Sequence, residues 1–391
     1  MTSHCSPERE GLSLTDYRLI NPPLSPKVRK YPIKILFNVW ADANNTNAQS
    51  LNARDIALRL APACFESSMF VRGKPDPRLL EHNGIRLIRL PRRLGSAKML
   101  AQLVWGKYDI LFYQPYIKCA EWYRLLIRMG KKKKLIVPVE GFIENTTPEN
   151  VRALRKFHEV LTRSDVVVPI SEFLREWIER EIGLKSCFCI PVGVDTNFFT
   201  PIPRNGSNHI HIIFVGRLIE RKGVHLVLEA ARIFPGVEFV IVGTSYDRED
   251  NLFATGLMQR TLQEGLRNVN FLGKLSQVEL RDLMQTSDIL LLPSRIEGIP
   301  KVTLEAAATG MPCIVFNDYR TPSVLHNVTG FQVNTVEEML KRLRELIENK
   351  HLRSKMGAAG AEHAKKFDWR IIAKQWEQVF EETVKKKAKV A

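Results

Sequence analysis

The chain has 391 residues, of which 45% are hydrophobic and 26% charged, and its formal net charge is +16 at pH 7. This length suffices for two domains of ordinary size, and the apolar share is that of a globular protein. No apolar run is long enough to cross a bilayer, and the N-terminal residues lack the hydrophobic core of a secretory signal. We therefore expect a cytoplasmic protein.

Basic runs occur at residues 27–30, 131–134 and 385–389. Anionic lipid, nucleic acid and acidic substrates all attract such runs, although a basic surface is also common in proteins that bind none of them. Because no nucleic-acid-binding motif accompanies the charge, we expect no nucleic-acid partner and rank an anionic membrane surface first. The aromatic helix expected at 117–129 leads into four lysines, and it fits either a core-facing helix or a peripheral membrane contact.

Residues 1–30 are polar and aperiodic, which predicts a mobile tail. Apolar runs then predict strands at 34–40, 68–72, 85–90, 109–113, 135–139, 165–170 and 187–191, with helices between most of them, the first at 51–60. Strands that alternate with helices form a parallel sheet covered on both faces. Glycine and proline after residue 190 mark a linker, so we place the first domain at 31–200.

A second series of strands follows the linker, at 210–215, 238–242, 269–272, 289–292, 312–316 and 330–333. It predicts a second domain of the same class at 201–367, and a last helix at 368–391. The six cysteines are scattered without the spacing of metal ligands, so we expect reduced thiols and no metal site.

The stretch PSRIEGIPKVTLE, residues 293–305, places Glu297 in a loop after a buried strand and Glu305 inside the following helix. Ligands of open α/β sheets bind at that edge. The spacing alone is a weak signal, because surface helices often carry two glutamates so placed. Arg217 and Lys222, however, follow another strand and suit phosphate oxygens, whereas carboxylates suit hydroxyls. A nucleotide-sugar offers both groups.

Five segments carry a family resemblance: IPVGVDTNFFTP, VGRLIERKG, NFLGKLS, DILLLPSRIEGIPKVTLEAAATGMPCIVF and VTGFQV. In this order, they resemble the retaining GT-B glycosyltransferases with an E-x7-E motif, the glycosyl transferases group 1. The resemblance implies an α/β fold of two Rossmann-like, doubly wound parallel-sheet domains facing a cleft, with the helix 368–391 crossing back to the first domain. It also implies transfer of a sugar from a nucleotide-sugar to an acceptor hydroxyl with retention of configuration.

The resemblance implies a role for each matching residue. Arg217 and Lys222 would neutralise the donor diphosphate and Glu297 would contact the transferred sugar, as the catalytic set. The other donor contacts would be Glu305 on the ribose, with Gly216, Lys274, Leu275, Gly298, Ile299, Lys301 and Val302 around the phosphates, sugar and base. No cofactor or metal is expected, because cationic side chains replace the metal.

Three features depart from the family pattern. Pro300 removes one N–H donor from the loop. The loop after the first strand carries Asn44, Asn45 and Asn47 in place of a pair of glycines. Glu140 stands about where members often have a histidine. We take these asparagines and Glu140 as candidates for the acceptor side.

The acceptor could be a glycan, a lipid-linked glycan or a small molecule, in polysaccharide, glycolipid or other glycoconjugate biosynthesis. Two alternatives stay open at this point. One is an inactive nucleotide-sugar-binding protein, which the departures keep open and the intact Arg217, Lys222, Glu297 and Glu305 argue against. The other is a GT-B sugar-nucleotide epimerase, which would need further acidic and histidine residues.

Overall fold

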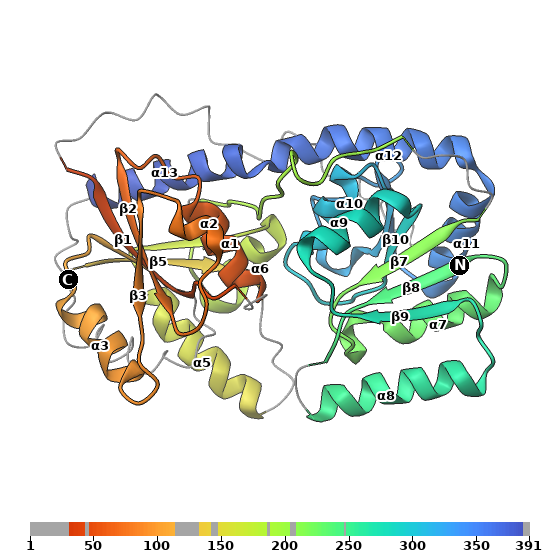
Figure 1. The fold of residues 1–391 in the computed structure, drawn as a ribbon, viewed down its shortest axis with the longest axis horizontal. Helices are drawn as coiled ribbons and strands as arrows, with labels where there is room; N and C mark the ends of the chain where they lie inside the picture. The colour runs from red at the N-terminus through yellow and green to blue at the C-terminus, as the bar shows by residue number, and fades with distance from the viewer. Residues whose placement is uncertain are drawn as a thin grey trace, which may run out of the picture.

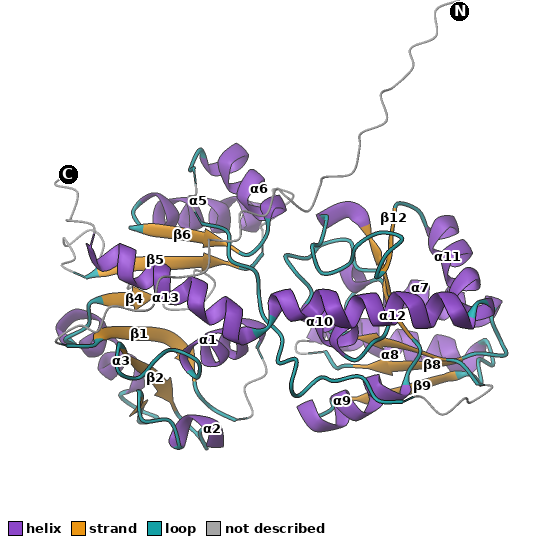
Figure 2. Cartoon of the chain, turned by 90° about the horizontal axis from the view of Figure 1, so that it is seen from above, coloured by secondary structure: helices purple, strands orange, loops and turns teal. Residues whose placement is uncertain are grey.

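The computed structural model describes residues 31–43, 47–113, 133–141, 148–185, 188–203, 209–245 and 248–385. In the helices that begin at residues 148 and 248, side chains are described from residues 154 and 251 onward. Two layered α/β domains lie side by side (Figures 1 and 2).

The first domain is built on a six-stranded parallel sheet of order β3-β2-β1-β4-β5-β6. Its strands are β1 (Ile33–Trp40), β2 (Phe65–Val71), β3 (Ile85–Arg89), β4 (Ile110–Phe112), β5 (Lys134–Val139) and β6 (Val166–Pro169). Its helices are α1 (Ala48–Ala57), α2 (Pro77–Leu80), α3 (Gly95–Trp105), α5 (Pro148–Thr162) and α6 (Glu172–Ile182). The helices α1 and α3 cover opposite faces of the sheet, because the chain winds outward from β1 in both directions (Figure 1).

The second domain repeats this plan with the order β12-β11-β10-β7-β8-β9. Its strands are β7 (His211–Val215), β8 (Glu238–Val242), β9 (Val269–Gly273), β10 (Ile289–Leu292), β11 (Cys313–Phe316) and β12 (Gly330–Val333). Its helices are η2 (Glu220–Lys222), α7 (Val224–Ile233), α8 (Arg248–Gln263), α9 (Gln277–Thr286), α10 (Lys301–Ala308), η3 (Asn317–Tyr319), α11 (Val336–Glu348), α12 (Lys350–Ala364) and η4 (Lys365–Phe367). The doubly wound α/β class predicted from the sequence is confirmed.

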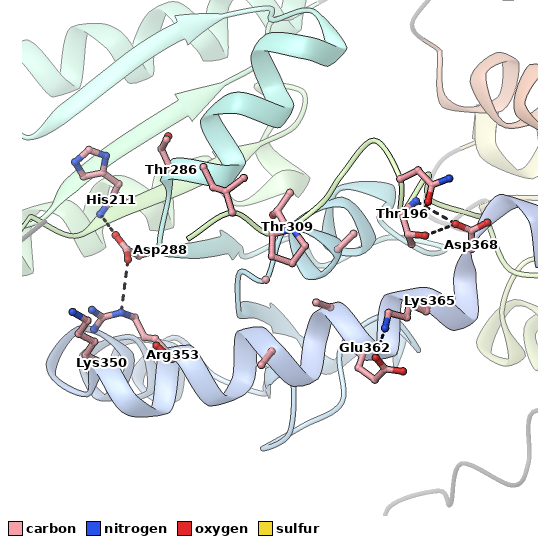
Figure 3. Close-up of a pocket in the computed structure, with 18 of the residues that line it drawn as sticks. Thr196, His211, Thr286, Asp288, Thr309, Lys350, Arg353, Glu362, Lys365 and Asp368 are labelled. Atoms are coloured by element: carbon pink, nitrogen blue, oxygen red, sulfur yellow. Dashed lines mark hydrogen bonds and ion pairs between the residues drawn. The ribbon is translucent and has the colours of Figure 1, made fainter. Parts of the chain in front are cut away.

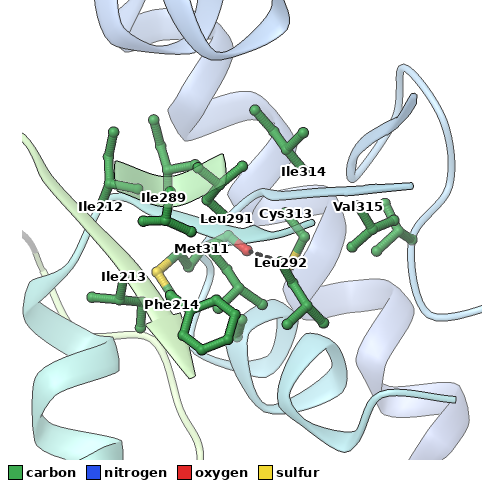
Figure 4. Close-up of a cluster of buried hydrophobic side chains, with 14 of the residues drawn as sticks. Ile212, Ile213, Phe214, Ile289, Leu291, Leu292, Met311, Cys313, Ile314 and Val315 are labelled. Carbon is green, nitrogen blue, oxygen red and sulfur yellow. Dashed lines mark hydrogen bonds between the residues drawn. The ribbon is translucent and has the colours of Figure 1, made fainter. Parts of the chain in front are cut away.

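The central strands of the second sheet are buried on both faces, which explains their unbroken apolar sequences. Every side chain of β10 is fully buried, and its register sets Leu290 beside Cys313 and Ile289 beside Ile212. Figure 4 shows buried side chains of β7, β10 and β11 lying close together, with Phe214 and Met311 among them. A rigid central sheet fixes the loops at its ends, where the predicted site lies.

Two sequence predictions need correction. Residues 188–191, expected to continue a strand, form none, although the Ile190 N–H donates to the Pro169 carbonyl at the end of β6 at 3.1 Å. Pro191 has no N–H with which to extend a ladder. The first helix begins at Ala48, before its expected start at residue 51, because the Asn47 side chain accepts hydrogen bonds from the N–H groups of Gln49 and Ser50.

The chain passes between the domains twice, at Val194 and at Asp368, and the two crossings pair with each other. Val194 N–H donates to the Phe367 carbonyl at 2.9 Å, and Trp369 N–H donates to the Val194 carbonyl at 3.0 Å. Helix α13 (Trp369–Lys385) then runs over the first domain (Figure 1). There Trp376 packs on Phe112 with ring centroids 5.1 Å apart, so α13 completes the core of a domain that begins about three hundred residues earlier.

Candidate functional site

The winding of both sheets reverses between two neighbouring strands, β1 and β4 in the first and β7 and β10 in the second. Ligands of such folds bind outside the carboxyl ends of the strands at this reversal. Gly216 and Arg217 directly follow β7, and the loop with Glu297 directly follows β10. The motif residues therefore occupy the topological position at which a binding site is expected.

Backbone contacts hold the loops after β7 and β10 together. Gly223 has φ +71°, and a Cβ there would lie 2.1 Å from the Pro293 carbonyl oxygen, so no side chain fits. Arg221 Nη1 donates to the Ile296 carbonyl at 3.0 Å, and the Arg295 N–H donates to the Arg221 carbonyl at 3.2 Å. These contacts fix the distance between Lys222 and Glu297.

Lys222 and Glu297 form an ion pair between Nζ and Oε1. The Ser294 hydroxyl donates to the same carboxylate oxygen at 2.6 Å. The two charged side chains are only 15% and 12% exposed, so their interaction is weakly screened. The structure thus brings together two of the three predicted catalytic residues. The third, Arg217, is partly buried at the start of the same loop as Lys222.

The N-terminus of α10 continues from this loop. Pro300 occupies the N-cap position without a side-chain cap, Ile299 packs into the core, and Lys301 and Val302 open the first turn. The first backbone N–H groups of a helix lack helical partners and, with the helix dipole, attract anions. This end of α10 is therefore a suitable place for phosphate oxygens.

Lys301 reaches across to the first domain. Its Nζ lies 3.3 Å from Asp55 Oδ2 on α1 and 5.5 Å from the centre of the Trp369 ring. Asp55 also pairs with Arg59 and Arg78, so it belongs to a larger charged cluster. Lys301, expected beside the donor phosphates, here joins the two domains.

Glu305 is almost completely buried in α10. Burial raises the pKa of its carboxyl, and the nearby Asp55 charge raises it further, whereas Lys301 acts to lower it. Lys301 therefore lies close to both Asp55 and Glu305 and offsets part of their negative charge.

Glu140 follows β5 and meets the second domain from the opposite side. Its Oε2 accepts a hydrogen bond from Asn52 Nδ2 at 2.9 Å, and a Cβ on Gly298 would lie 2.3 Å from its carbonyl oxygen. Burial raises the pKa of Glu140 to about 7, although the Asn52 hydrogen bond and the Lys301 charge oppose this shift. The backbones of the two domains are thus in direct contact beside Glu297.

The remaining candidates lie further from this contact. Asn47 uses its side-chain oxygen to cap α1, and Asn44 and Asn45 lie outside the described residues. Lys274 and Leu275 follow the edge strand β9, where Lys274 is exposed and Leu275 partly buried. In the first domain, Asp42 instead of a glycine pair organises the loop after β1, by accepting hydrogen bonds from the N–H groups of Arg72 and Gly73.

The sequence analysis missed three residues that position the site: Ser294, which holds Glu297; Asn52, which holds Glu140; and Asp55, which holds Lys301. Asn52 and Asp55 are 4% and 6% exposed although they are polar. Half of the residues of α1 are polar, so nothing in the sequence of this helix singles out Asn52 and Asp55.

A groove of about 1070 Å³ lies elsewhere on the second domain (Figure 3). His211 and Asp288 lie at one end and Thr196 and Asp368 at the other, with α12 along its length. None of the predicted site residues is among the described residues that line it. Since β7 and β10 begin at the groove, it marks the amino ends of the strands, opposite the edge that carries Glu297.

Within the described parts of the chain, no cluster of three or more His, Cys, Asp or Glu side chains is arranged to hold a metal ion. In the same parts, no helix has both the length and the apolar character required to cross a bilayer.

Comparison with known proteins agrees with this geometry. Residues 197–363 match the family described as Glycosyl transferases group 1. The matched residues make up less than half of the chain. The match includes Arg217, Lys222, Glu297 and Glu305, but it does not extend over the first domain.

Curated relatives match more of the chain. A GDP-mannose-dependent monoacylated alpha-(1-6)-phosphatidylinositol monomannoside mannosyltransferase of Corynebacterium glutamicum is 28% identical over 58% of this chain and 64% of its own length. Glycogen synthase of Mycobacterium tuberculosis is 26% identical over 76% of this chain and 72% of its own. An Escherichia coli UDP-Gal:alpha-D-GlcNAc-diphosphoundecaprenol alpha-1,3-galactosyltransferase is 27% identical over 63% and 68%.

Solved structures show that the fold is shared over both domains. Sucrose-phosphate synthase from Thermosynechococcus elongatus superposes with a TM-score of 0.78 at 20% identity, over 90% of this chain and 99% of that one. Anabaena HepE in complex with UDP and glucose gives 0.73 at 20% identity, over 89% and 99%. The chain therefore has the GT-B fold.

Proposed function

We propose that the protein transfers a sugar from a nucleoside diphosphate sugar to an acceptor hydroxyl with retention of anomeric configuration. The observation that carries this proposal is the Lys222–Glu297 pair, held by Ser294 beside the N-terminus of α10 at the reversal of the second sheet. A sugar diphosphate has phosphate oxygens, which suit the cation and the helix N-terminus, and hydroxyls, which suit the carboxylate.

Each group has a role in the reaction. Negative charge grows on the diphosphate as the bond from the anomeric carbon to the phosphate oxygen breaks. Lys222, Arg217 and the first N–H groups of α10 would therefore stabilise the transition state more than the bound donor. The Glu297 carboxylate already accepts hydrogen bonds from Lys222 and Ser294. We therefore assign Glu297 to binding the sugar hydroxyls and not to nucleophilic attack. Glu305 is assigned to the ribose.

Retention then follows from attack on the face that the diphosphate leaves. The acceptor oxygen forms the new bond to the anomeric carbon, and its proton passes to an oxygen of the departing diphosphate. Arg217 and Lys222 supply the positive charge, so we propose that neither a metal ion nor a cofactor takes part.

Two relatives indicate a class of acceptor. The printed names of the corynebacterial and Escherichia coli enzymes refer to lipid-bearing acceptors, a phosphatidylinositol mannoside and a diphosphoundecaprenol. We propose that this protein likewise acts on a lipid-linked glycan, on the side of the first domain marked by Glu140 and Asn47.

The test is release of nucleoside diphosphate from a panel of UDP-, GDP- and ADP-sugars. One donor should be hydrolysed slowly without acceptor, and the Lys222→Ala and Glu297→Gln variants should each lower that rate by about a hundredfold or more. The Lys341→Ala variant, on the exposed side of α11, should match the wild type. EDTA should leave the rate unchanged.

Thermal unfolding with each nucleotide separates the alternatives. Stabilisation by one nucleotide without release from any donor would indicate a binding protein without turnover. Unchanged rates in both variants, or no stabilisation by any nucleotide, would contradict the proposed donor site.

A further inference from the structure

Helix α3 has apolar residues on two faces, of which only one is covered. Met99 and Leu103 point into the core of the first domain. On the other side, Leu94, Lys98, Ala101 and Trp105 recur at intervals of four, three and four residues, which places them in one stripe along the helix. Leu94 is 67% exposed and Trp105 77% exposed. The outward stripe of a surface helix is ordinarily polar, so the exposed Leu94 and Trp105 indicate that this side of α3 binds a partner.

The surroundings of the stripe are basic. Residues 82–108 contain six arginines and lysines and no aspartate or glutamate. All six are exposed, and four of them lie at or next to α3: Arg92, Arg93, Lys98 and Lys107. A partly buried lysine adds positive charge at the far end of α3, because Lys133 Nζ donates to the Leu103 and Val104 carbonyls at 2.6 and 2.9 Å and so caps the C-terminus of the helix. The partner must therefore tolerate apolar contact and attract positive charge.

We propose that this face of α3, made of Leu94, Lys98, Ala101 and Trp105 with Arg92, Arg93 and Lys107, binds the surface of an anionic lipid bilayer. Tryptophan and leucine enter the boundary between headgroups and acyl chains, while arginine and lysine extend their charged ends to the phosphates. A protein partner fits less well, because protein interfaces are depleted in lysine, and this face carries Lys98 and Lys107. The acid-free sequence supplies the charge complementarity that an anionic leaflet requires.

The position of α3 relates this surface to the site. A Cβ on Gly95, the first residue of α3, would lie 3.4 Å from the Arg72 guanidinium, which in turn covers the ring of Trp40 at the end of β1. The helix therefore begins at the carboxyl edge of the first sheet, the edge on which Asn47 and Glu140 lie. It runs along the outer flank of the domain, away from α13 (Figure 1). Docking would hold that edge next to lipid.

The proposal does not depend on the reaction, because binding to vesicles requires neither donor nor turnover. It also differs from the membrane contact considered for residues 117–129, which lie outside the described part of the chain.

Co-sedimentation with vesicles tests the proposal. At low salt, the wild type should bind vesicles of phosphatidylcholine with about 30 mol% phosphatidylglycerol, and binding should fall as salt rises. Binding to pure phosphatidylcholine should be at least tenfold weaker. The Leu94→Ser/Trp105→Ser and Arg93→Glu/Lys98→Glu variants should each lose at least tenfold of the binding to anionic vesicles. Their thermal unfolding should match the wild type, because these four side chains are exposed.

Two controls use exposed residues of other helices. The first control is Leu262→Ser, at a residue of α8 that is 82% exposed. The second is Lys341→Glu, at an exposed residue of α11. Both should bind vesicles like the wild type. Equal binding by all variants, or no binding by the wild type at low salt, would overturn the proposal. Self-association that the Leu94→Ser/Trp105→Ser variant abolishes, without vesicle binding, would also overturn it and assign the stripe to a second copy.

Discussion

Glu140 is a partly buried carboxylate where the backbones of the two domains meet, and its protonation links the site to pH. Burial raises its pKa to about 7. In the unfolded chain the carboxyl ionises near its ordinary value of about 4.3. Between these values the folded protein binds the additional proton, so the free energy of unfolding contributed by this residue falls as pH rises from about 4.5 to 7.

The Glu140→Gln variant should therefore be more stable than the wild type at pH 8, by about 1–3 kcal/mol, and equally stable near pH 4.5. The amide keeps the shape of the side chain but has no charge to desolvate. Urea unfolding at the two pH values measures the difference. Glu348→Gln, at an exposed residue of α11, should show none. A gain of the same size at both pH values would mean that the charge of Glu140 does not matter.

At the residue scale, the motif residues could be assigned from the sequence, whereas their partners could not. Glu297 and Lys222 stand in recognisable segments that also order them along the fold. The contact of Asn52 with Glu140 spans 88 residues, and that of Lys301 with Asp55 spans 246. Such pairs depend on how two domains meet, which no local pattern encodes.

The loop from Pro293 to Pro300 contacts the first domain at Gly298, so the spacing of the two domains affects the position of this loop. A methyl group there would lie 2.3 Å from the Glu140 carbonyl oxygen. Since that neighbour is backbone, the domains must move apart to accept it. The movement would also lengthen the contact from Lys301 to Asp55.

The Gly298→Ala variant should hydrolyse its donor at least tenfold more slowly, because a shift of about 1 Å in a reacting geometry costs up to a hundredfold in rate. Both domain cores are intact in the Gly298→Ala variant, so the melting temperature of the variant should be close to that of the wild type. Gly256→Ala provides the matched control: a Cβ at that position on α8 has no neighbour within 4 Å. It should leave the rate unaltered and add about 0.5–1 kcal/mol of stability. An unaltered rate in Gly298→Ala would show that the two backbones can separate without consequence for the site.

At the element scale, strands were predictable where the apolar run was continuous and ended at a turn. The expected ranges of β8, β10 and β12 equal the observed ones. The error at 188–191 arose because the apolar residues there contact β6 without a hydrogen-bond ladder. The early start of α1 arose because its cap, Asn47, was assigned to ligand binding instead.

Two connections join the domains. One is the hydrogen-bonded pairing of Val194 with Phe367 and Trp369, and the other is α13, which follows the second domain in sequence but packs on the first. Asp368 accepts hydrogen bonds from the Thr196 hydroxyl and from Arg370, at the point where α13 begins. These bonds hold the pKa of Asp368 at about 2, although burial acts to raise it. The carboxylate thus stabilises the crossing at neutral pH.

The core contribution of α13 is large. Trp376 is 3% exposed and packs on Phe112 and Phe380. The Trp376→Ala variant should lose about 3–5 kcal/mol of stability, as large-to-small changes in cores do. Ile371→Ala, at a position of the same helix that is 45% exposed, should lose less than about 0.5 kcal/mol. Urea unfolding followed by tryptophan fluorescence would measure both, and equal losses would mean that α13 is not part of the first core.

At the scale of the molecule, the alternation of strands and helices was enough to predict two doubly wound sheets. The contact between the sheets could not be predicted in this way. It rests on Gly298, Lys301 and the crossing at Val194 and Asp368, where small changes of angle decide which residues touch.

The path of α13 also sets an order for synthesis. Residues 31–200 leave the ribosome first, but α1 covers only part of the sheet face formed by β1 and β4, and the rest waits for residues 369–385. Translation of the whole second domain must therefore finish before the first domain can close its core. The domain that is made first is the one completed last, and during that interval the aromatic side chains that α13 will cover are open to aggregation and to chaperones.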